Sequence, residues 1–119
     1  MEKLLFNKNF TCVAVSKTKP VDDIKKIYNL GHKEFGENKV QELLDKYDKL
    51  PKDIKWHMIG HLQTNKIKKV IPIISLIHSV DSLKLLKKIN NEAIKINKVI
   101  SCLLQINISN ENNKYGFTR

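Results

Sequence analysis

The sequence predicts an α/β fold in which short parallel strands alternate with helices. Five short apolar runs alternate with four amphipathic segments, and no Gly- or Ser-rich linker separates them. This alternation favours one parallel sheet with helices packed on it. Right-handed crossovers then leave two arrangements, an open doubly wound sheet or part of a barrel. We expect a single domain over residues 1–119.

The first elements have clear boundaries. Residues 11–16 form a short, β-branched, apolar run, which is typical of a strand buried on both faces. A helix is expected to open at Pro20, where the missing N–H costs nothing, and Gly31 is a candidate C-cap for it. Residues 34–37 predict a very short second strand.

The middle of the chain continues the alternation. A second helix is expected from about Asn38, which forms a near-capping-box with Gln41, to Pro51. Residues 54–59 predict a third strand, and residues 62–71 predict a helix that ends before a proline.

The last elements are longer. Residues 73–80 predict a fourth strand, and Asp81 is the expected cap of a long helix whose apolar stripe ends at Ile96. Residues 99–108 predict the fifth strand, after which the chain becomes polar.

The strong positive charge is a weak guide to function. The formal net charge is +10, but Lys supplies 21 of the 22 cations and Arg119 is the only arginine. Proteins that read DNA grooves depend on the bidentate fork of Arg, which Lys cannot reproduce. We therefore interpret the lysines as solvated helix faces and expect no specific nucleic-acid partner. A basic nucleic-acid-binding or partner-docking module remains the alternative.

Several other classes of protein are excluded or disfavoured. Cys12 and Cys102 lie far apart without metal-ligand spacing, which indicates reduced structural cysteines in a cytoplasmic protein and no metal. The longest apolar run, residues 70–77, is too short to span a bilayer, so no membrane partner is expected. The motifs GxGxxG, GxxxxGK[ST] and GxSxG are absent from the sequence, so nucleotide binding and serine hydrolysis are unsupported.

Chemistry in a parallel α/β fold is expected at the carboxyl ends of the strands. Each expected strand is followed by groups able to hydrogen-bond or to react. In chain order these are Lys17, Glu37, Asn38, Gly60, His61, Ser79, Asp81, Asn107 and Ser109.

Lys17 is the most informative of these residues. A lysine that ends an apolar strand is tethered to the core, where desolvation lowers its pKa. A neutral amine there is the nucleophile that Schiff-base chemistry with an aldehyde needs, and Lys19 adds like-charge pressure in the same direction. The alternative is a lysine that extends from the rim into water, and position alone favours this alternative.

The remaining candidates are individually weaker. Local evidence favours Asn38 as a helix cap, which also faces the strand ends. His57 is expected in the core, whereas His61 follows Gly60 in a turn from which its ring can reach a bound molecule. His78 is expected to point away from its neighbour on the strand, because side chains alternate along a strand.

Five motifs in order carry a family resemblance. They are VAVSKTKP at residues 13–20, FGENKVQE at 35–42, WHMIGHLQTNK at 56–66, HSVD at 78–81 and QINIS at 105–109. Together they resemble the pyridoxal phosphate homeostasis protein family, also called the YggS or proline-synthetase co-transcribed family. The resemblance implies a partial (β/α)8 TIM-type barrel of the alanine racemase N-terminal type, with about five parallel strands and four helices present.

The resemblance also implies a cofactor and a function. Pyridoxal 5′-phosphate (PLP) would be held as a Schiff base on Lys17, with Asn38, His61, Ser79 and Asn107 on the cofactor side. Family members have no established catalytic turnover and maintain vitamin B6 homeostasis, so we expect a PLP-binding protein that is not an enzyme and has no catalytic residues. One alternative is a PLP-dependent amino-acid racemase, for which the tyrosines of this chain offer no convincing second base. The other is a non-functional gene fragment.

Length complicates this expectation. The chain has 119 residues, about half of the roughly 250 that a closed (β/α)8 barrel needs. Against the family it looks truncated at both ends, with only a short segment before the first strand. It also lacks the later Gly/Ser-rich phosphate-binding segment and the arginine near the pyridine nitrogen. Five parallel strands leave an open edge. We expect a monomer, with self-association through that edge as the alternative.

Overall fold

The computed structural model describes residues 10–106 and contains one parallel sheet of five strands in the order β1-β2-β3-β4-β5. The strands are β1 (Ala14–Val15), β2 (Glu34–Glu37), β3 (Lys55–Met58), β4 (Ile74–Val80) and β5 (Ser101–Leu104). The strand order follows the sequence without a reversal, whereas a doubly wound sheet reverses at its switch point. The sheet is therefore wound in one direction, as in part of a barrel.

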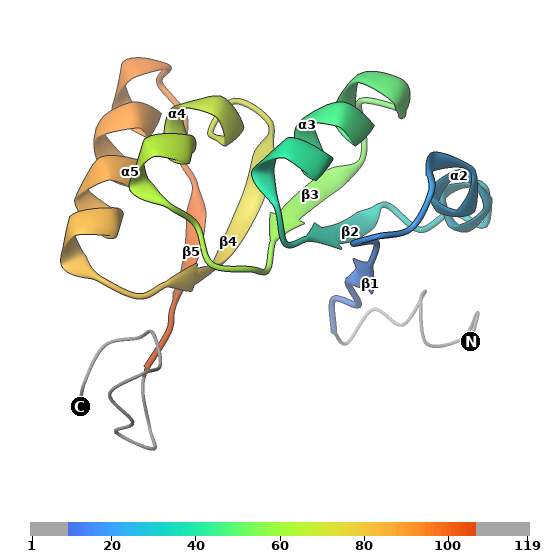
Figure 1. Ribbon diagram of the computed structural model, residues 1–119, viewed down its shortest axis with the longest axis horizontal. Helices are drawn as coiled ribbons and strands as arrows, with labels where there is room; N and C mark the ends of the chain where they lie inside the picture. The colour runs from blue at the N-terminus through green and yellow to red at the C-terminus, as the bar shows by residue number, and fades with distance from the viewer. Residues whose placement is uncertain (1–9, 107–119) are drawn as a thin grey trace.

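The helices cover one face of this sheet. They are α2 (Val21–Asn29), α3 (Val40–Lys49), α4 (Ile67–Val70), which follows the 3-10 turn η1 (Thr64–Lys66), and α5 (Leu83–Lys95). Figure 1 shows α3, α4 and α5 side by side along the same side of the strands. The opposite face of the sheet has no helix over it within residues 10–106.

The core lies between the helices and this covered face. Phe35, Trp56, Met58 and Ile77 point into it from β2, β3 and β4, and each is almost fully buried. Since β-strand side chains alternate, the residues between them face the uncovered side. Helix residues such as Leu43 complete the cluster. The predicted alternation of strands and helices is confirmed; β2 has its predicted bounds, and the other strands are shorter than the sequence indicated.

Two predicted caps at the starts of helices are wrong. Lys39, rather than Asn38, is the N-cap of α3, and its side chain makes no capping hydrogen bond. Ser82, rather than Asp81, is the N-cap of α5, and its hydroxyl accepts the backbone N–H of Leu85 at 3.1 Å. One hydroxyl in the right backbone conformation satisfies an orphan N–H of the first turn.

Three further boundaries differ from expectation. Pro20 is the N-cap of α2 rather than its first helical residue, and Gly31 lies one residue beyond the C-cap with a φ of 100°, a conformation that glycine adopts without strain. The helix expected over 62–71 divides into η1 and α4. Asn107 and Ser109 lie outside the described residues. No helix of the described part of the chain is both long and apolar enough to cross a membrane.

Candidate functional site

The carboxyl ends of β2, β3 and β4 are held together by backbone contacts. A Cβ atom on Gly60 would lie 2.7 Å from the backbone oxygen of Asn38, so only glycine permits this close approach. The hydroxyl of Ser79 donates to the backbone oxygen of Gly60, which ties the end of β4 to the same turn. The structure thus brings the predicted residues Asn38, His61 and Ser79 to one edge of the sheet.

Ser79 and His61 differ in solvent exposure. Ser79 is 4% exposed, and its hydroxyl hydrogen is used within the protein. The His61 side chain is 37% exposed, and its Nδ1 lies 2.9 Å from Oδ2 of Asp81, an ion-pair contact without hydrogen-bond alignment. Asp81, predicted as a helix cap, instead approaches the ring of His61.

Lys17 lies in the turn that follows β1. The backbone N–H of Ser16 donates to Gly36 O at 3.0 Å, and the N–H of Lys19 donates to Ser16 O at 3.1 Å. The Lys17 side chain is exposed, and within residues 10–106 no hydrogen bond or ion pair engages its amine. The Lys17 side chain is thus open to water, as in the alternative that position alone favoured, and is not tethered into the core.

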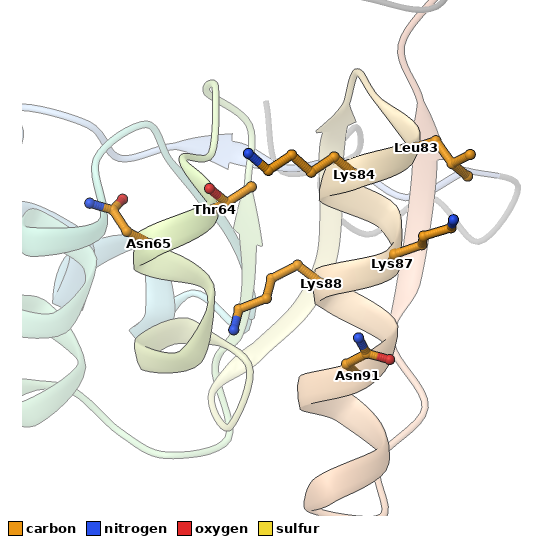
Figure 2. Close-up of a pocket in the computed structure, with 7 residues that line it drawn as sticks. All are labelled: Thr64, Asn65, Leu83, Lys84, Lys87, Lys88 and Asn91. Carbon is orange, nitrogen blue, oxygen red and sulfur yellow. The ribbon is translucent and has the colours of Figure 1, made fainter.

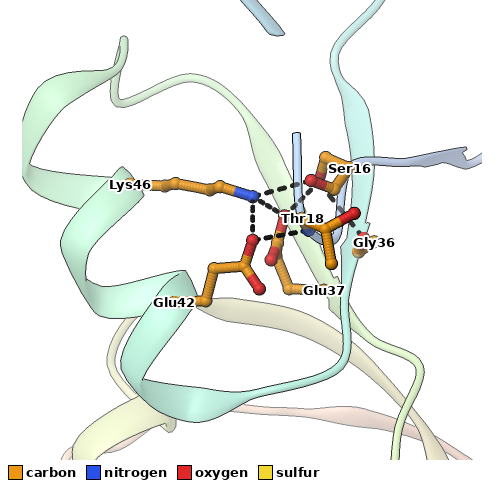
Figure 3. A network of polar contacts seen from close by, with 6 residues as sticks. All are labelled: Ser16, Thr18, Gly36, Glu37, Glu42 and Lys46. Carbon is orange, nitrogen blue, oxygen red and sulfur yellow. Dashed lines mark hydrogen bonds and ion pairs between the residues drawn. The ribbon is translucent and has the colours of Figure 1, made fainter. Parts of the chain in front are cut away.

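A group of charges, two of them buried and the third half-buried, lies next to this turn (Figure 3). We call Glu37, Glu42 and Lys46 the α3 cluster. Lys46 Nζ donates to Glu37 Oε2 at 2.8 Å and to Glu42 Oε2 at 2.7 Å, and its third hydrogen bond goes to the backbone oxygen of Ser16 at 2.6 Å. The Lys46 side chain is 7% exposed, although its sequence context indicated a solvated helix face.

The α3 cluster also contacts the turn through its carboxylates. Glu42 Oε2 accepts the backbone N–H of Thr18 at 2.6 Å, and Glu37 Oε2 accepts the hydroxyl of Ser16. The hydrogen bond from Lys46, followed by that from the Thr18 N–H, lowers the pKa of Glu42 against the opposing effect of burial. Sequence analysis named Glu37 as a strand-end residue but missed Glu42 and Lys46. The i,i+4 spacing of Glu42 and Lys46 was the one available signal.

A second polar chain lies on the uncovered face of the sheet. His57 Nδ1 lies 2.9 Å from His78 Nε2, and His57 Nε2 lies 2.9 Å from Glu34 Oε1. His57 is 3% exposed, so it is buried as predicted, but it lies outside the core under the helices, between His78 and Glu34. His78 meets His57, whereas its neighbour Ser79 contacts Gly60. Burial and the neighbouring His57 lower the pKa of His78. These polar contacts link β2, β3 and β4 on the face of the sheet opposite the helices.

A basic groove of about 660 Å³ lies apart from these strand ends, between η1 and α5 (Figure 2). Lysine and asparagine side chains form most of its wall. The lining residues are Thr64, Asn65, Leu83, Lys84, Lys87, Lys88 and Asn91. The groove lies in the helix layer and contains none of the predicted site residues. Within residues 10–106, no three His, Cys, Asp or Glu side chains are placed to hold a metal ion.

Comparison with known proteins identifies close sequence relatives. The chain is 44% identical over 109 residues to a pyridoxal phosphate homeostasis protein of Synechocystis sp., a match that covers 90% of this chain and 50% of that protein. It is also 44% identical over 114 residues to the protein of that name in Mus musculus, covering 87% and 41%. No protein-family profile matches the sequence. The chain spans about half the length of the curated relatives it matches.

Solved structures agree with the fold described above. PipY of Synechococcus elongatus, in a structure with PLP bound, matches with a TM-score of 0.85 and 32% identity over 97% of this chain and 54% of its own. An alanine racemase of Clostridium difficile 630 matches with a TM-score of 0.76 over 98% of this chain and 31% of its own, but at 16% identity. The second match shows the fold alone, and the two together confirm a partial barrel of the alanine racemase type.

Proposed function

This chain is homologous to the pyridoxal phosphate homeostasis proteins over nine tenths of its length, and on this basis we propose that it binds PLP through Lys17 and contributes to vitamin B6 homeostasis. PLP supplies a reactive aldehyde that condenses with a primary amine. The residues of this chain supply the amine, fix its position and line the neighbouring strand ends.

The observation that carries the proposal is the setting of Lys17. Its side chain is exposed, and within the described residues its amine is not committed to a carboxylate or carbonyl. Its backbone neighbours Ser16 and Thr18 are both hydrogen-bonded to the α3 cluster. A free amine on a fixed backbone at a strand end fits the aldehyde end of PLP.

The other candidate residues have different proposed roles. Asn38 is half-buried at the end of β2 and would offer its amide to the cofactor. His61 is open enough to contact a ligand, whereas Ser79 would act by holding the turn at Gly60. Asn107, the fifth candidate, lies outside the described residues. The described residues contain no arginine, so the phosphate group would depend on lysine, amide and backbone donors.

We propose a role in holding PLP without catalytic turnover. Storage of an aldehyde needs an amine and shelter from competing nucleophiles, and it needs no second proton-transfer group opposite Lys17. The likeness to alanine racemase concerns the fold and supplies no racemase activity. A cytoplasmic location and a monomeric state complete the proposal.

The test is to add PLP to the purified chain. We expect the visible absorbance of PLP condensed with an amine, and borohydride reduction should fix one cofactor on Lys17, as located by peptide mass spectrometry. Lys17→Ala should lose both signals. Lys19→Ala, which removes an exposed lysine two residues away, should keep them. Equal labelling of the wild type and Lys17→Ala would overturn the assignment.

A further inference from the structure

Charged side chains of β2 and α3 hold the turn around Lys17 by hydrogen bonds. Lys46 uses all three of its ammonium hydrogens, on Ser16 O, Glu37 Oε2 and Glu42 Oε2, at 2.6–2.8 Å. Figure 3 shows these bonds converging from α3 on the chain that leaves β1. Hydrogen bonds to ionised groups are stronger than neutral ones, and those from Lys46 to Ser16 and Glu37 are also buried, whereas the bond from Lys46 to Glu42 is partly buried.

These bonds reach the chain on both sides of Lys17. Before it, Ser16 is bound through its backbone oxygen by Lys46 and through its hydroxyl by Glu37. After it, the Thr18 N–H donates to Glu42 at 2.6 Å. Within residues 10–106, the Lys17 side chain makes no hydrogen bond or ion pair with the cluster. The cluster therefore fixes the backbone position of Lys17 without forming a hydrogen bond to its amine.

The backbone conformation of Thr18 explains why the turn needs these hydrogen bonds. Thr18 has a φ of 63°, in the left-handed region that a β-branched residue rarely adopts. A strained conformation persists only where the surroundings enforce it. Here the enforcing contact is the charge-assisted hydrogen bond from the Thr18 N–H to Glu42, which Lys46 in turn holds in place.

We propose that Glu37, Glu42 and Lys46 act as positioning residues that hold the turn of residues 16–18 in its strained form and so orient Lys17 toward the aldehyde it binds. This inference rests on the proposed function of Lys17. It adds that the affinity for PLP depends on a lysine that never touches the cofactor. Lys46 acts through the Ser16 and Thr18 backbone, and Lys17 carries the reacting nitrogen.

The first arm of the test needs no cofactor. Hydrogen exchange of the Thr18 amide is measured in the wild type, Lys46→Met, Glu42→Ala and Glu42→Gln, with Lys88→Met as the control. Lys88 makes an i,i+4 pair with Glu92 on α5, at 3.1 Å, away from the turn. Loss of a hydrogen bond to a charged group predicts at least about tenfold faster Thr18 exchange in Glu42→Ala and Lys46→Met. Lys88→Met should exchange like the wild type.

Conservative replacement separates positioning from general destabilisation. Glu42→Gln keeps an oxygen that accepts the Thr18 N–H, so it should recover part of the protection that Glu42→Ala loses. Amides of the β3–β4 ladder serve as an internal reference, because their exchange reports the stability of the sheet. If Lys46→Met fails to fold, Glu42→Ala and Glu42→Gln still decide the question.

The second arm measures PLP binding by absorbance and borohydride labelling. We expect Lys46→Met and Glu42→Ala to weaken PLP binding by about tenfold or more, and Glu42→Gln by less. Folded Lys46→Met and Glu42→Ala variants with wild-type Thr18 exchange and PLP affinity would overturn the inference. If the wild type binds no PLP, the proposed function fails, whereas the exchange arm still shows whether the cluster holds the turn.

Discussion

Two clusters of lysine and glutamate in this molecule share a sequence pattern and differ in burial. The α3 cluster pairs Glu42 with Lys46 at i,i+4, and the Lys46 side chain is 7% exposed. On α5, Glu92 accepts from Lys88 and Lys95, each at 3.1 Å, and these lysines are 43% and 65% exposed. We call the second group the α5 cluster.

The clusters differ in what their lysines reach. Lys46 extends beyond its own helix to the ends of β1 and β2, whereas Lys88 and Lys95 bind only a glutamate of their own helix. An exposed pair within one helix contributes little to stability, because water screens it and side-chain entropy opposes it. A buried pair that joins three elements fixes their relative position, but it becomes costly when one partner is lost.

The largest expected effect is that of Lys46→Met on stability. Met preserves most of the volume of the side chain but leaves Glu37, which is fully buried, without its cation. Breaking a buried pair in this way costs about 3–5 kcal/mol of unfolding free energy. Since small domains are stable by about 5–15 kcal/mol, urea unfolding should show a large drop in midpoint.

Two controls sharpen this prediction. The double variant Lys46→Met with Glu37→Gln removes both charges, so it should be more stable than Lys46→Met alone. Lys88→Met in the α5 cluster should shift the midpoint far less than Lys46→Met does. If Lys88→Met and Lys46→Met destabilise the chain equally, burial does not separate the two clusters.

Acidification should lower the stability of the fold by less than Lys46→Met does. The hydrogen bond from Lys46 lowers the pKa of Glu42, and the one from Lys88 lowers the pKa of Glu92. A glutamate with a lowered folded-state pKa stabilises the fold above its unfolded pKa of about 4.3, and this stabilisation is lost as the pH falls through the folded value. Stability should therefore fall as wild-type protein is acidified below about pH 4.3, and less steeply in Glu42→Gln and in Glu92→Gln.

Salt distinguishes the two glutamates in the same titration. At 1 M salt the Debye length falls to about 3 Å, which screens exposed charges more than buried ones. Glu42 and Glu92 are themselves 25% and 6% exposed, so the difference lies in their lysines. The acid effect traced to Glu92, whose partners Lys88 and Lys95 are open to water, should shrink in high salt. The effect traced to Glu42, whose partner Lys46 is buried, should largely persist. Thermal melts between pH 3 and pH 6, at low and high salt, measure both. An equal loss for the two would contradict the comparison.

The strands, the family resemblance and the position of Asn38 could be predicted from the sequence. The five strands were predictable because buried parallel strands are continuous apolar runs. Five ordered motifs together indicated the family of the relatives named above. The placement of Asn38 beside Gly60 followed from the rule that parallel strands end at one edge. Each of these features depends on local pattern or on topology.

Lys46 could not be predicted in the same way. The spacing of Glu42 and Lys46 is also that of Lys88 and Glu92 in reverse order, and lysine is abundant throughout the chain. Only the packing of α3 against the end of β1 buries Lys46, whereas Lys88 and Lys95 stay open to water around a buried Glu92. The helix caps were predicted wrongly for a related reason. Whether Asp81 or Ser82 caps α5 depends on which of the two has the extended backbone conformation of an N-cap, and the sequence does not specify this.

The smallest expected effect concerns two residues with positive φ, one beside each cluster. Thr18 follows Lys17 with a φ of 63°, and Asn97 follows α5 with a φ of 54°. The left-handed region costs an ordinary L-residue roughly 1–2 kcal/mol, but asparagine tolerates it. Glycine removes this strain and loses about 0.5–1 kcal/mol through the greater freedom of its unfolded chain.

Thr18→Gly should therefore be more stable than Asn97→Gly by roughly 1–2 kcal/mol, as measured by urea unfolding, because the entropic cost of glycine is common to both variants and only Thr18 is relieved of strain. The N–H at position 18 is kept, so the hydrogen bond to Glu42 persists and the gain reports strain alone. In the Glu42→Ala background the turn is free to relax, and the gain from Thr18→Gly should shrink. A gain of the same size in both backgrounds would mean that Glu42 does not enforce the conformation of Thr18. The strain would then be set by the chain leaving β1 rather than by the α3 cluster.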